Sequence, residues 1–137
     1  MKRILFICTG NSCRSQMAEV LANYYGRFKV QAFSAGVSPM PVTQTTKTVL
    51  EEIGLDTSSL QSKHLDHFSK DQFDFVITLS DHAKSTCMQK NLAKTNLHWD
   101  IEDPYSESVV DKKAALSKYK RVRDQLKDSI SDFLENL

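Results

Sequence analysis

The sequence lacks any hydrophobic run that could cross a membrane, and it carries almost no net charge. A membrane helix needs roughly 20 apolar residues in succession, and no stretch of the 137 residues approaches that length. The basic start is followed by the apolar run Ile4–Ile7, which is too short for the core of a signal peptide. The net charge of +1 gives no reason to expect binding to nucleic acid or to an anionic membrane. We therefore expect a cytoplasmic protein that binds neither nucleic acid nor a membrane.

Cysteine is scarce, and the three residues Cys8, Cys13 and Cys87 are an odd number. Without an export signal, an odd number argues against a framework of structural disulfides. The four histidines are scattered, and none has the spacing of a zinc site relative to the cysteines. We therefore expect no metal site and no cofactor, and each cysteine either fills the core or takes part in chemistry.

Internal repeats and linkers are also absent, so the chain is expected to form a single domain, 1–137, large enough for a hydrophobic core. Apolar runs of strand length alternate with segments of helical periodicity. The expected strands are 3–8, 28–34, 73–79 and 95–98, and the expected helices are 14–25, 42–53, 81–90 (capped by Ser80) and 112–136. Residues 55–70 are expected to form a loop with a single helical turn. This alternation predicts an α/β fold with a parallel sheet and right-handed crossovers.

The strongest functional signal is the stretch Cys8-Thr-Gly-Asn-Ser-Cys-Arg-Ser15, which lies between the first strand and the first helix. Backbone N–H groups in such a loop, together with the partial positive charge at the start of the helix, can bind a tetrahedral oxyanion. Arg14 adds a planar fork of donors that matches two oxyanion oxygens. The same surroundings favour the thiolate form of Cys8. We therefore predict that Cys8 is a nucleophile placed beneath a bound oxyanion.

The remaining residues of this loop are expected to support the anion and the nucleophile. The predicted oxyanion-binding residues are Thr9, Gly10, Asn11, Ser12, Cys13 and Arg14. Ser15 can donate a hydrogen bond to the Cys8 thiolate. Asn11 tolerates a left-handed backbone better than most residues, and its side chain can brace the loop. The alternatives are a buried core cysteine at Cys8 and an ordinary first-turn serine at Ser15.

Asp103-Pro104 is the second candidate for chemistry. Loops that follow the carboxyl ends of parallel strands gather at one edge of the sheet, so loops 8–15, 80–87 and 99–105 should meet there. Displacement at an oxyanion needs an acid on the leaving oxygen, opposite the nucleophile, which favours Asp103. The neighbouring Glu102 is an alternative acid, and a simple turn beginning with Asp103 is the alternative without function.

These motifs, and the chain as a whole, resemble the low-molecular-weight protein tyrosine phosphatase superfamily and, within it, the thioredoxin-coupled arsenate reductases. The resemblance lies in Cys8–Glu19, Phe33–Gly36, Val76–Leu79, His98-Trp99, Asp103-Pro104 and Arg121–Asp124. Gln16, where the phosphatases usually have proline, favours the reductases, as does His98-Trp99, whereas Tyr105 favours the phosphatases. The resemblance implies a four-stranded parallel sheet with helices on both faces in three layers. It also implies Cys8 as nucleophile, Arg14 as oxyanion clamp and Asp103 as general acid, and we expect a monomer.

The resemblance further implies that arsenate is reduced by a relay of thiols, with thioredoxin or a similar thiol as the final reductant. Cys87 matches the outer thiol of that relay, but Ser80 stands at the inner thiol, and a hydroxyl cannot form a disulfide. Three explanations remain open. Ser80 is an engineered replacement of cysteine; or Cys87 or Cys13 resolves Cys8 directly; or the protein is a phosphatase that works through a phosphocysteine at Cys8. A non-catalytic oxyanion sensor is a further alternative, but it would need no Cys8 and Asp103 pair.

Two other positions carry expectations from the resemblance. Cys13 can form a reversible disulfide with the nucleophile, or it can be a small buried side chain. Lys63 stands where the family has the acidic residue of a potassium site formed with Asn11, Glu19 and Ser34. The Lys63 ammonium could replace the ion and pair with Glu19, so we expect no potassium dependence, with a solvated lysine as the alternative.

Overall fold

The computed structural model describes residues 1–88, 90–105 and 111–137, and these form the predicted α/β fold. The elements in chain order are β1 (Lys2–Cys8), α1 (Arg14–Tyr25), β2 (Val30–Gly36), α2 (Gln44–Glu51), the 3-10 helix η1 (Leu65–Phe68), β3 (Phe73–Thr78), α3 (Asp81–Cys87), β4 (Ala93–His98) and α4 (Lys112–Glu135). Among these residues, no helix combines the length and the apolar character that a membrane crossing requires.

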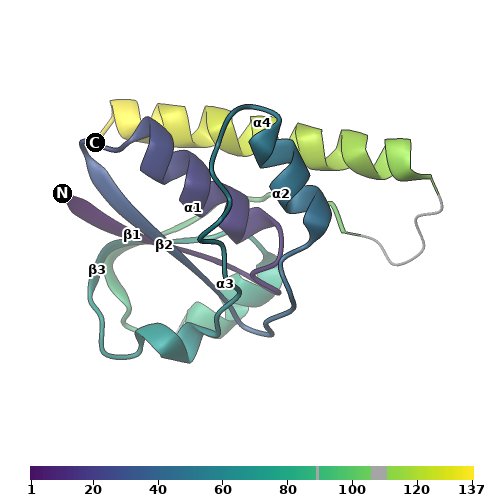
Figure 1. Ribbon diagram of the computed structural model, residues 1–137. Coiled ribbons are helices and arrows are strands. Elements are labelled where there is room, and N and C mark those ends of the chain that lie inside the picture. Colours follow the sequence, from purple (N-terminus) through teal and green to yellow (C-terminus); the bar gives the residue numbers. More distant parts are fainter. Residues whose placement is uncertain (89, 106–110) are drawn as a thin grey trace.

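The four strands form one parallel sheet in the order β2-β1-β3-β4, with helices on both of its faces. In Figure 1, α1, α2 and α4 cover one face, and α3 lies on the other. The strand registers pair Cys8 with Gly36, Ile7 with Thr78, and Thr78 with His98. The carboxyl ends of all four strands therefore share one edge, and the loops that follow them meet there, as the sequence predicts.

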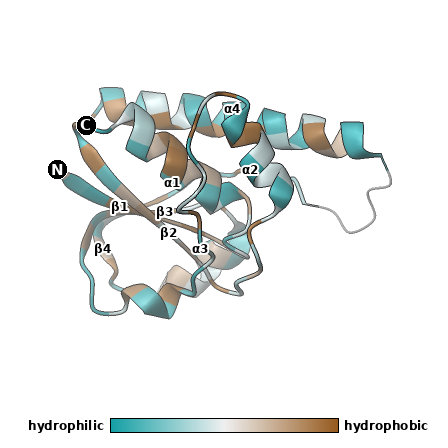
Figure 2. Cartoon of the chain, in the orientation of Figure 1, coloured by the Kyte–Doolittle hydropathy of each residue, from teal (hydrophilic) through white to brown (hydrophobic). Residues whose placement is uncertain are grey.

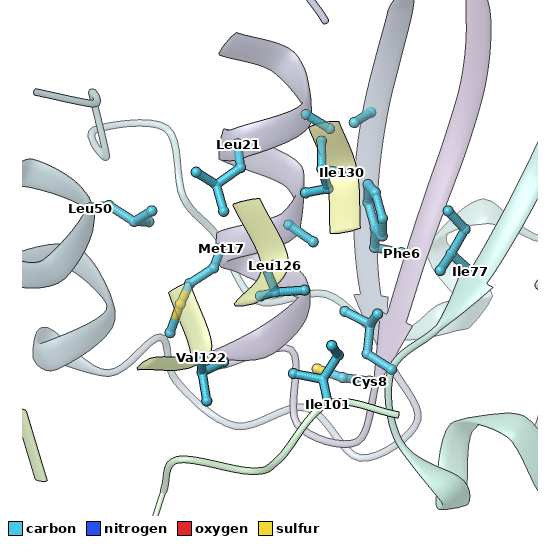
Figure 3. Packing of buried hydrophobic residues seen from close by; sticks show 14 of the residues in the cluster. Phe6, Cys8, Met17, Leu21, Leu50, Ile77, Ile101, Val122, Leu126 and Ile130 are labelled. Atoms are coloured by element: carbon cyan, nitrogen blue, oxygen red, sulfur yellow. The ribbon is translucent and has the colours of Figure 1, made fainter. Parts of the chain in front are cut away.

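Two hydrophobic clusters, one on each side of the sheet, join the layers. In the larger cluster, Phe6 and Ile77 of the sheet face α1, α2 and α4, which contribute Met17, Leu50 and Leu126 (Figure 3). Figure 2 shows hydrophobic and hydrophilic segments alternating along α4, as expected for a helix with one buried face. Burial on both faces explains why the strand cores read as continuous apolar runs.

Element boundaries differ from the predictions by a few residues, and hydrogen bonds at the ends explain the differences. α2 begins at residue 44 because the Thr43 side chain accepts from the Thr46 N–H and caps the helix. β2 extends to Gly36 because that residue pairs with the end of β1. α3 ends at Cys87, three residues earlier than predicted. Its start is as predicted, since the Ser80 side chain accepts from the Ala83 N–H.

Leu126→Ala should destabilise the protein strongly, because Leu126 is fully buried where α4 packs on α1 and the sheet. Removing a buried leucine side chain costs about 2–5 kcal/mol through lost burial and the cavity it leaves. Urea denaturation followed by circular dichroism measures this change in the free energy of unfolding. Leu137→Ala is the matched control, because Leu137 is 42% exposed at the chain end. If Leu126→Ala lowered the free energy of unfolding as little as Leu137→Ala does, the result would contradict the packing described.

Candidate active site

The loop between β1 and α1 folds tightly around the sulfur of Cys8. The Asn11 backbone has the predicted left-handed conformation, with φ of 51°, and its N–H points at Cys8 Sγ over 3.2 Å. The loop packs directly on Gly36 at the end of β2. A Cβ atom at Gly36 would lie 2.8 Å from the Thr9 carbonyl oxygen and 2.9 Å from Asn11. Only glycine at this position therefore lets the loop approach the sheet so closely.

The side chain of Asn11 is the brace of the loop. Its Nδ2 donates to Ser15 Oγ at 2.7 Å and to Ser34 Oγ at 3.0 Å. Its Oδ1 accepts from the Lys63 backbone N–H at 2.8 Å and from Gln16 Nε2 at 3.0 Å. Both ends of the amide are therefore occupied, which fixes its orientation.

This orientation determines where the Ser15 proton goes. Ser15 Oγ already accepts a hydrogen bond from Asn11, so its single hydrogen is available for Cys8 Sγ, which lies 2.8 Å away. Ser34 in turn donates to a Glu19 carboxylate oxygen at 2.9 Å. A continuous set of hydrogen bonds thus connects Cys8 to the partly buried Glu19.

The Cys8 thiol is subject to opposing effects on its pKa. Burial raises this pKa and is the largest effect, while the hydrogen bond from Ser15, the charge of Arg14 and the Asn11 N–H lower it. The sequence predicted that the loop favours the thiolate. Its donors do lower the pKa of Cys8, but burial raises this pKa by more, so the thiolate depends on the donors that face the sulfur.

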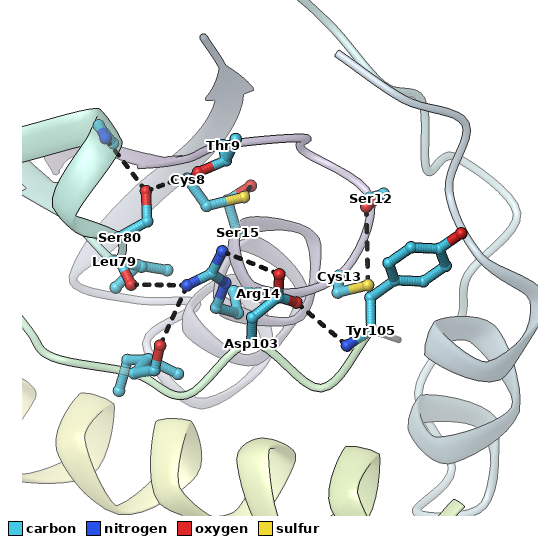
Figure 4. A network of polar contacts seen from close by, with 12 residues as sticks. Cys8, Thr9, Ser12, Cys13, Arg14, Ser15, Leu79, Ser80, Asp103 and Tyr105 are labelled. Carbon is cyan, nitrogen blue, oxygen red and sulfur yellow. Dashed lines mark hydrogen bonds and ion pairs between the residues drawn. The ribbon is translucent and has the colours of Figure 1, made fainter. Parts of the chain in front are cut away.

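Arg14 joins the loop to the segment that follows β4 (Figure 4). Its Nη1 donates to the carbonyl oxygens of Leu79 at 3.3 Å and Ile101 at 3.1 Å, and its Nη2 lies 3.6 Å from Asp103 Oδ2. The Asp103 side chain is half exposed. Glu102, the alternative acid, instead pairs with Arg121 on α4 at 3.3 Å. The geometry thus places Asp103, and not Glu102, beside the oxyanion loop.

A cavity of about 250 Å³ opens above Cys8. It is lined by Cys8, Thr9, Gly10, Ser12, Cys13, Arg14, Ser38, Met40, Asp103 and Tyr105. Ser38 and Met40 were not predicted, because they lie on a loop after β2 that carries no motif. Their backbone N–H groups donate to the carbonyls of Thr9 and Gly10 at 2.8 Å, which brings that loop to the cavity. The feature that could have indicated Ser38 and Met40 at the cavity is the position of β2, the strand before their loop, beside β1.

Ser80 and Cys87 lie at opposite ends of α3, and only Ser80 touches the oxyanion loop. Ser80 Oγ accepts from Thr9 Oγ1 at 3.0 Å. Cys87 is buried in the cluster on the other side of the sheet, and burial raises the pKa of its thiol. Seven residues of helix span about 10 Å, whereas disulfide-bonded residues have Cα atoms about 4.4–6.8 Å apart. The intact helix therefore holds Cys87 away from Ser80, the residue that contacts the loop, and in a different hydrophobic cluster from Cys8.

Cys13 contacts hydroxyl groups of Tyr119 on α4 and of Thr43, which caps α2. Its Sγ lies 3.2 Å from Tyr119 Oη and 3.7 Å from Thr43 Oγ1. Burial, followed by the contact with Cys13, raises the pKa of the Tyr119 phenol, so Tyr119 stays protonated. All three cysteines are free.

The ion pair that Lys63 could have formed with Glu19 is not present among the described residues, and the alternative, a lysine side chain at the protein surface, describes the structure better. Lys63 Nζ donates to the Gln61 carbonyl oxygen at 2.7 Å, and no ion pair joins Lys63 to Glu19 in the part of the chain that the structure describes. Burial raises the pKa of Glu19, and the Ser34 hydrogen bond and the Lys63 charge lower it. Lys63 acts on the site mainly through its backbone N–H to Asn11.

Comparison with known proteins assigns this arrangement to a family. The family described as low molecular weight phosphotyrosine protein phosphatase matches residues 3–137. The chain belongs to this family. An arsenate reductase from Halalkalibacterium halodurans is 36% identical over 135 residues, which cover 98% of this chain and 96% of the relative. The resemblance inferred from the sequence is thereby confirmed.

Two solved structures show how far the fold is shared. An arsenate reductase in the phosphate binding state has a TM-score of 0.79 and 29% identity, covering 99% of this chain and 98% of that chain. A low-molecular-weight protein tyrosine phosphatase from T. tengcongensis has a TM-score of 0.84 and 28% identity, and both chains are fully covered. The fold alone therefore does not choose between reductases and phosphatases.

Ser15→Ala should raise the pKa of Cys8 further, because the thiolate loses its hydroxyl donor while the sulfur stays buried. A hydrogen bond to a charged group contributes about 1.5–3 kcal/mol, so Cys8 at neutral pH should react about 10- to 100-fold more slowly. The rate of iodoacetamide alkylation of Cys8, measured against pH, reports both changes. The thiolate fraction grows with pH, so the profile of the variant should move to higher pH.

Ser62→Ala is the control for this measurement. The Ser62 hydroxyl donates to the Gly10 carbonyl oxygen at 3.3 Å, so it contacts the same loop without facing the sulfur. Its alkylation profile should match that of the wild type. Equal profiles for Ser15→Ala and the wild type would show that Ser15 does not stabilise the thiolate.

Proposed function

We propose that the protein reduces arsenate to arsenite, with Cys8 as the nucleophile. The observation that carries this proposal is the placement of Cys8 Sγ beneath a cavity bordered by Arg14 and Asp103, with Ser15 and the Asn11 N–H as donors to the sulfur. The curated relative at 36% identity over nearly the whole chain is an arsenate reductase, which supports the choice of oxyanion.

The first step forms a bond between sulfur and arsenic. Arsenate binds to the N–H groups of the loop and to Arg14, and the Cys8 thiolate attacks arsenic. One arsenate oxygen leaves as water after protonation by Asp103 acting as general acid. Arsenic is still As(V) in this adduct, so the step changes no oxidation state.

The second step transfers the electrons. A second thiolate attacks the Cys8 sulfur, the new S–S bond forms, and the S–As bond breaks with its electron pair left on arsenic. Arsenic is reduced to As(III) and leaves as arsenite, while two thiols are oxidised to one disulfide. Thioredoxin or a similar dithiol then reduces this disulfide, and one monomer is sufficient for the whole cycle.

We assign Cys87 as the second thiol, since Ser80 has no sulfur. This requires α3 to unwind, because about 10 Å of helix separates Cys87 from the residue that contacts the loop. α3 has only seven residues, and its start is held by the Ser80 cap on Ala83, the contact of Ser80 with Thr9 and the burial of Ala83. Helices this short have little stability of their own in water. Cys13 is the alternative second thiol, and its sulfur faces Tyr119.

The test is arsenite release in the presence of arsenate, thioredoxin, thioredoxin reductase and NADPH, with disulfides mapped by mass spectrometry. Cys8→Ser should abolish arsenite release, and Cys87→Ser should abolish turnover. Cys13→Ser should retain turnover and the disulfide between Cys8 and Cys87. A disulfide between Cys8 and Cys13, with turnover in Cys87→Ser, would replace Cys87 by Cys13 in the scheme.

Ser80→Cys should raise arsenite turnover by about tenfold or more, because a thiol next to the loop attacks the adduct without unwinding of α3. Ser85→Cys is the matched control, since it adds a thiol to an exposed position of the same helix. Turnover in the control should equal that of the wild type. Unchanged turnover in Ser80→Cys would show that residue 80 does not limit the relay.

Hydrolysis of phosphate esters is the second candidate, and the cavity wall favours it. Tyr105 and Met40 are both about half exposed at the cavity, where they can contact an organic group attached to the oxyanion. Water would then hydrolyse a phosphocysteine at Cys8, and no second thiol is needed. Release of phosphate from an aryl phosphate without arsenite formation, lost in Cys8→Ser and reduced about 10²- to 10⁴-fold in Asp103→Asn, would establish this activity instead.

A further inference from the structure

Three side chains that can bind a metal ion meet beside the start of α3. Asp81 is the first residue of α3, His98 is the last residue of β4, and Asp100 follows two residues later. One ligand atom of each lies within 4.8 Å of the others. The sequence prediction compared histidine spacing only with cysteines, so it had no means to pair His98 with two carboxylates. The parallel sheet brings them together, because β3, which leads into α3, lies beside β4.

One ring nitrogen of His98 faces Thr78, and the other faces Asp81. Thr78 Oγ1 lies 2.8 Å from His98 Nδ1 and 3.3 Å from the Leu97 carbonyl oxygen. When the threonine hydrogen goes to Leu97, the threonine oxygen accepts from Nδ1–H, and the lone pair of the neutral imidazole lies on Nε2. Nε2 lies 3.7 Å from Asp81 Oδ1. In this tautomer the lone pair faces one carboxylate with a second beside it, and a cation bound between them would stabilise the arrangement.

We propose that Asp81, His98 and Asp100 bind a divalent ion of the first transition row, with Mn²⁺ as the probe. Two carboxylate oxygens and one imidazole nitrogen suit such an ion, and the two negative charges balance its charge. Ligand atoms at about 2.0–2.2 Å from one ion lie no more than about 4.4 Å apart. The ligand atoms now lie within 4.8 Å of one another. Small rotations of the exposed Asp81 and Asp100 side chains would bring them within the distance that one ion allows.

Thr78 completes the site as an outer partner. Histidines that bind metals usually donate their other ring N–H to a neighbouring group, which sets the tautomer and the ring orientation. In the proposed site the Thr78 hydroxyl oxygen, on the strand next to β4, accepts this N–H from His98 Nδ1. A bound ion would join the start of α3 to the end of β4, and so hold α3 in its folded position. This site is separate from Cys8, and the proposal does not depend on which reaction Cys8 performs.

Titration of the full-length, reduced protein with Mn²⁺, followed by the electron paramagnetic resonance signal of free Mn²⁺, tests the proposal. Mn²⁺ prefers oxygen and nitrogen ligands to thiolates, so the cysteines compete weakly. The wild type should bind one ion per chain. His98→Ala and Asp81→Asn should each weaken binding at least about tenfold, and Thr78→Val should weaken it about 10- to 100-fold.

His82→Ala is the matched control, because His82 is an exposed histidine next to Asp81 on the same helix. Its affinity for Mn²⁺ should equal that of the wild type. Asp81→Asn keeps the test valid if His98→Ala fails to fold, since the Asp81 side chain is 95% exposed. Absence of binding at one ion per chain, equal binding by Asp81→Asn and the wild type, or a loss in His82→Ala as large as in Asp81→Asn would each overturn the site.

Discussion

The amide group of Asn11 fixes the arrangement of the whole site. Its two donors and its carbonyl oxygen contact Ser15, Ser34, Gln16 and the backbone of Lys63, so one side chain joins β2, α1 and the loop before η1. A buried polar group whose partners are all present stabilises a single geometry, and every alternative leaves one of them without a hydrogen bond. The direction of the Ser15 hydroxyl follows from that geometry. The reactivity of Cys8 is therefore set by residues far apart in the sequence.

Local patterns predicted the fold well because each element carries its own signal. The apolar runs of β1 and β3 and the periodicity of α1 and α4 reflect burial on the two sides of one sheet. The loop from Cys8 to Ser15 was predictable for the same reason, since a strand, a tight turn and a helix follow one another directly. Ser38 and Met40 were missed because they reach the cavity only through backbone hydrogen bonds to Thr9 and Gly10, which any residue type can make.

The charge and burial of the site residues were harder to predict from the sequence than their positions in the fold. The loop pattern shows which donors surround Cys8 but not how completely its sulfur is removed from water, and burial has the larger effect on the pKa of the thiol. Lys63 illustrates the same limit. A lysine at the position of an acid left open an ion pair with Glu19 or a solvated side chain. In the structure its ammonium contacts the Gln61 carbonyl oxygen, and its backbone N–H donates to Asn11. A contact made by a backbone N–H cannot be predicted from the residue type.

Ser80 affects the proposed chemistry in two ways that act in the same direction. A serine at this position has no sulfur with which to attack a Cys8 adduct, so in the proposed scheme the second thiol is Cys87, with Cys13 as the alternative. The same hydroxyl caps α3 through the Ala83 N–H, and a serine cap stabilises a helix by about 1 kcal/mol. It therefore also strengthens the helix that, in the proposed scheme, unwinds so that Cys87 reaches the loop. A cysteine at this position would supply a thiol and weaken the cap, so the identity of one residue determines both the nucleophile available and the freedom of α3 to move.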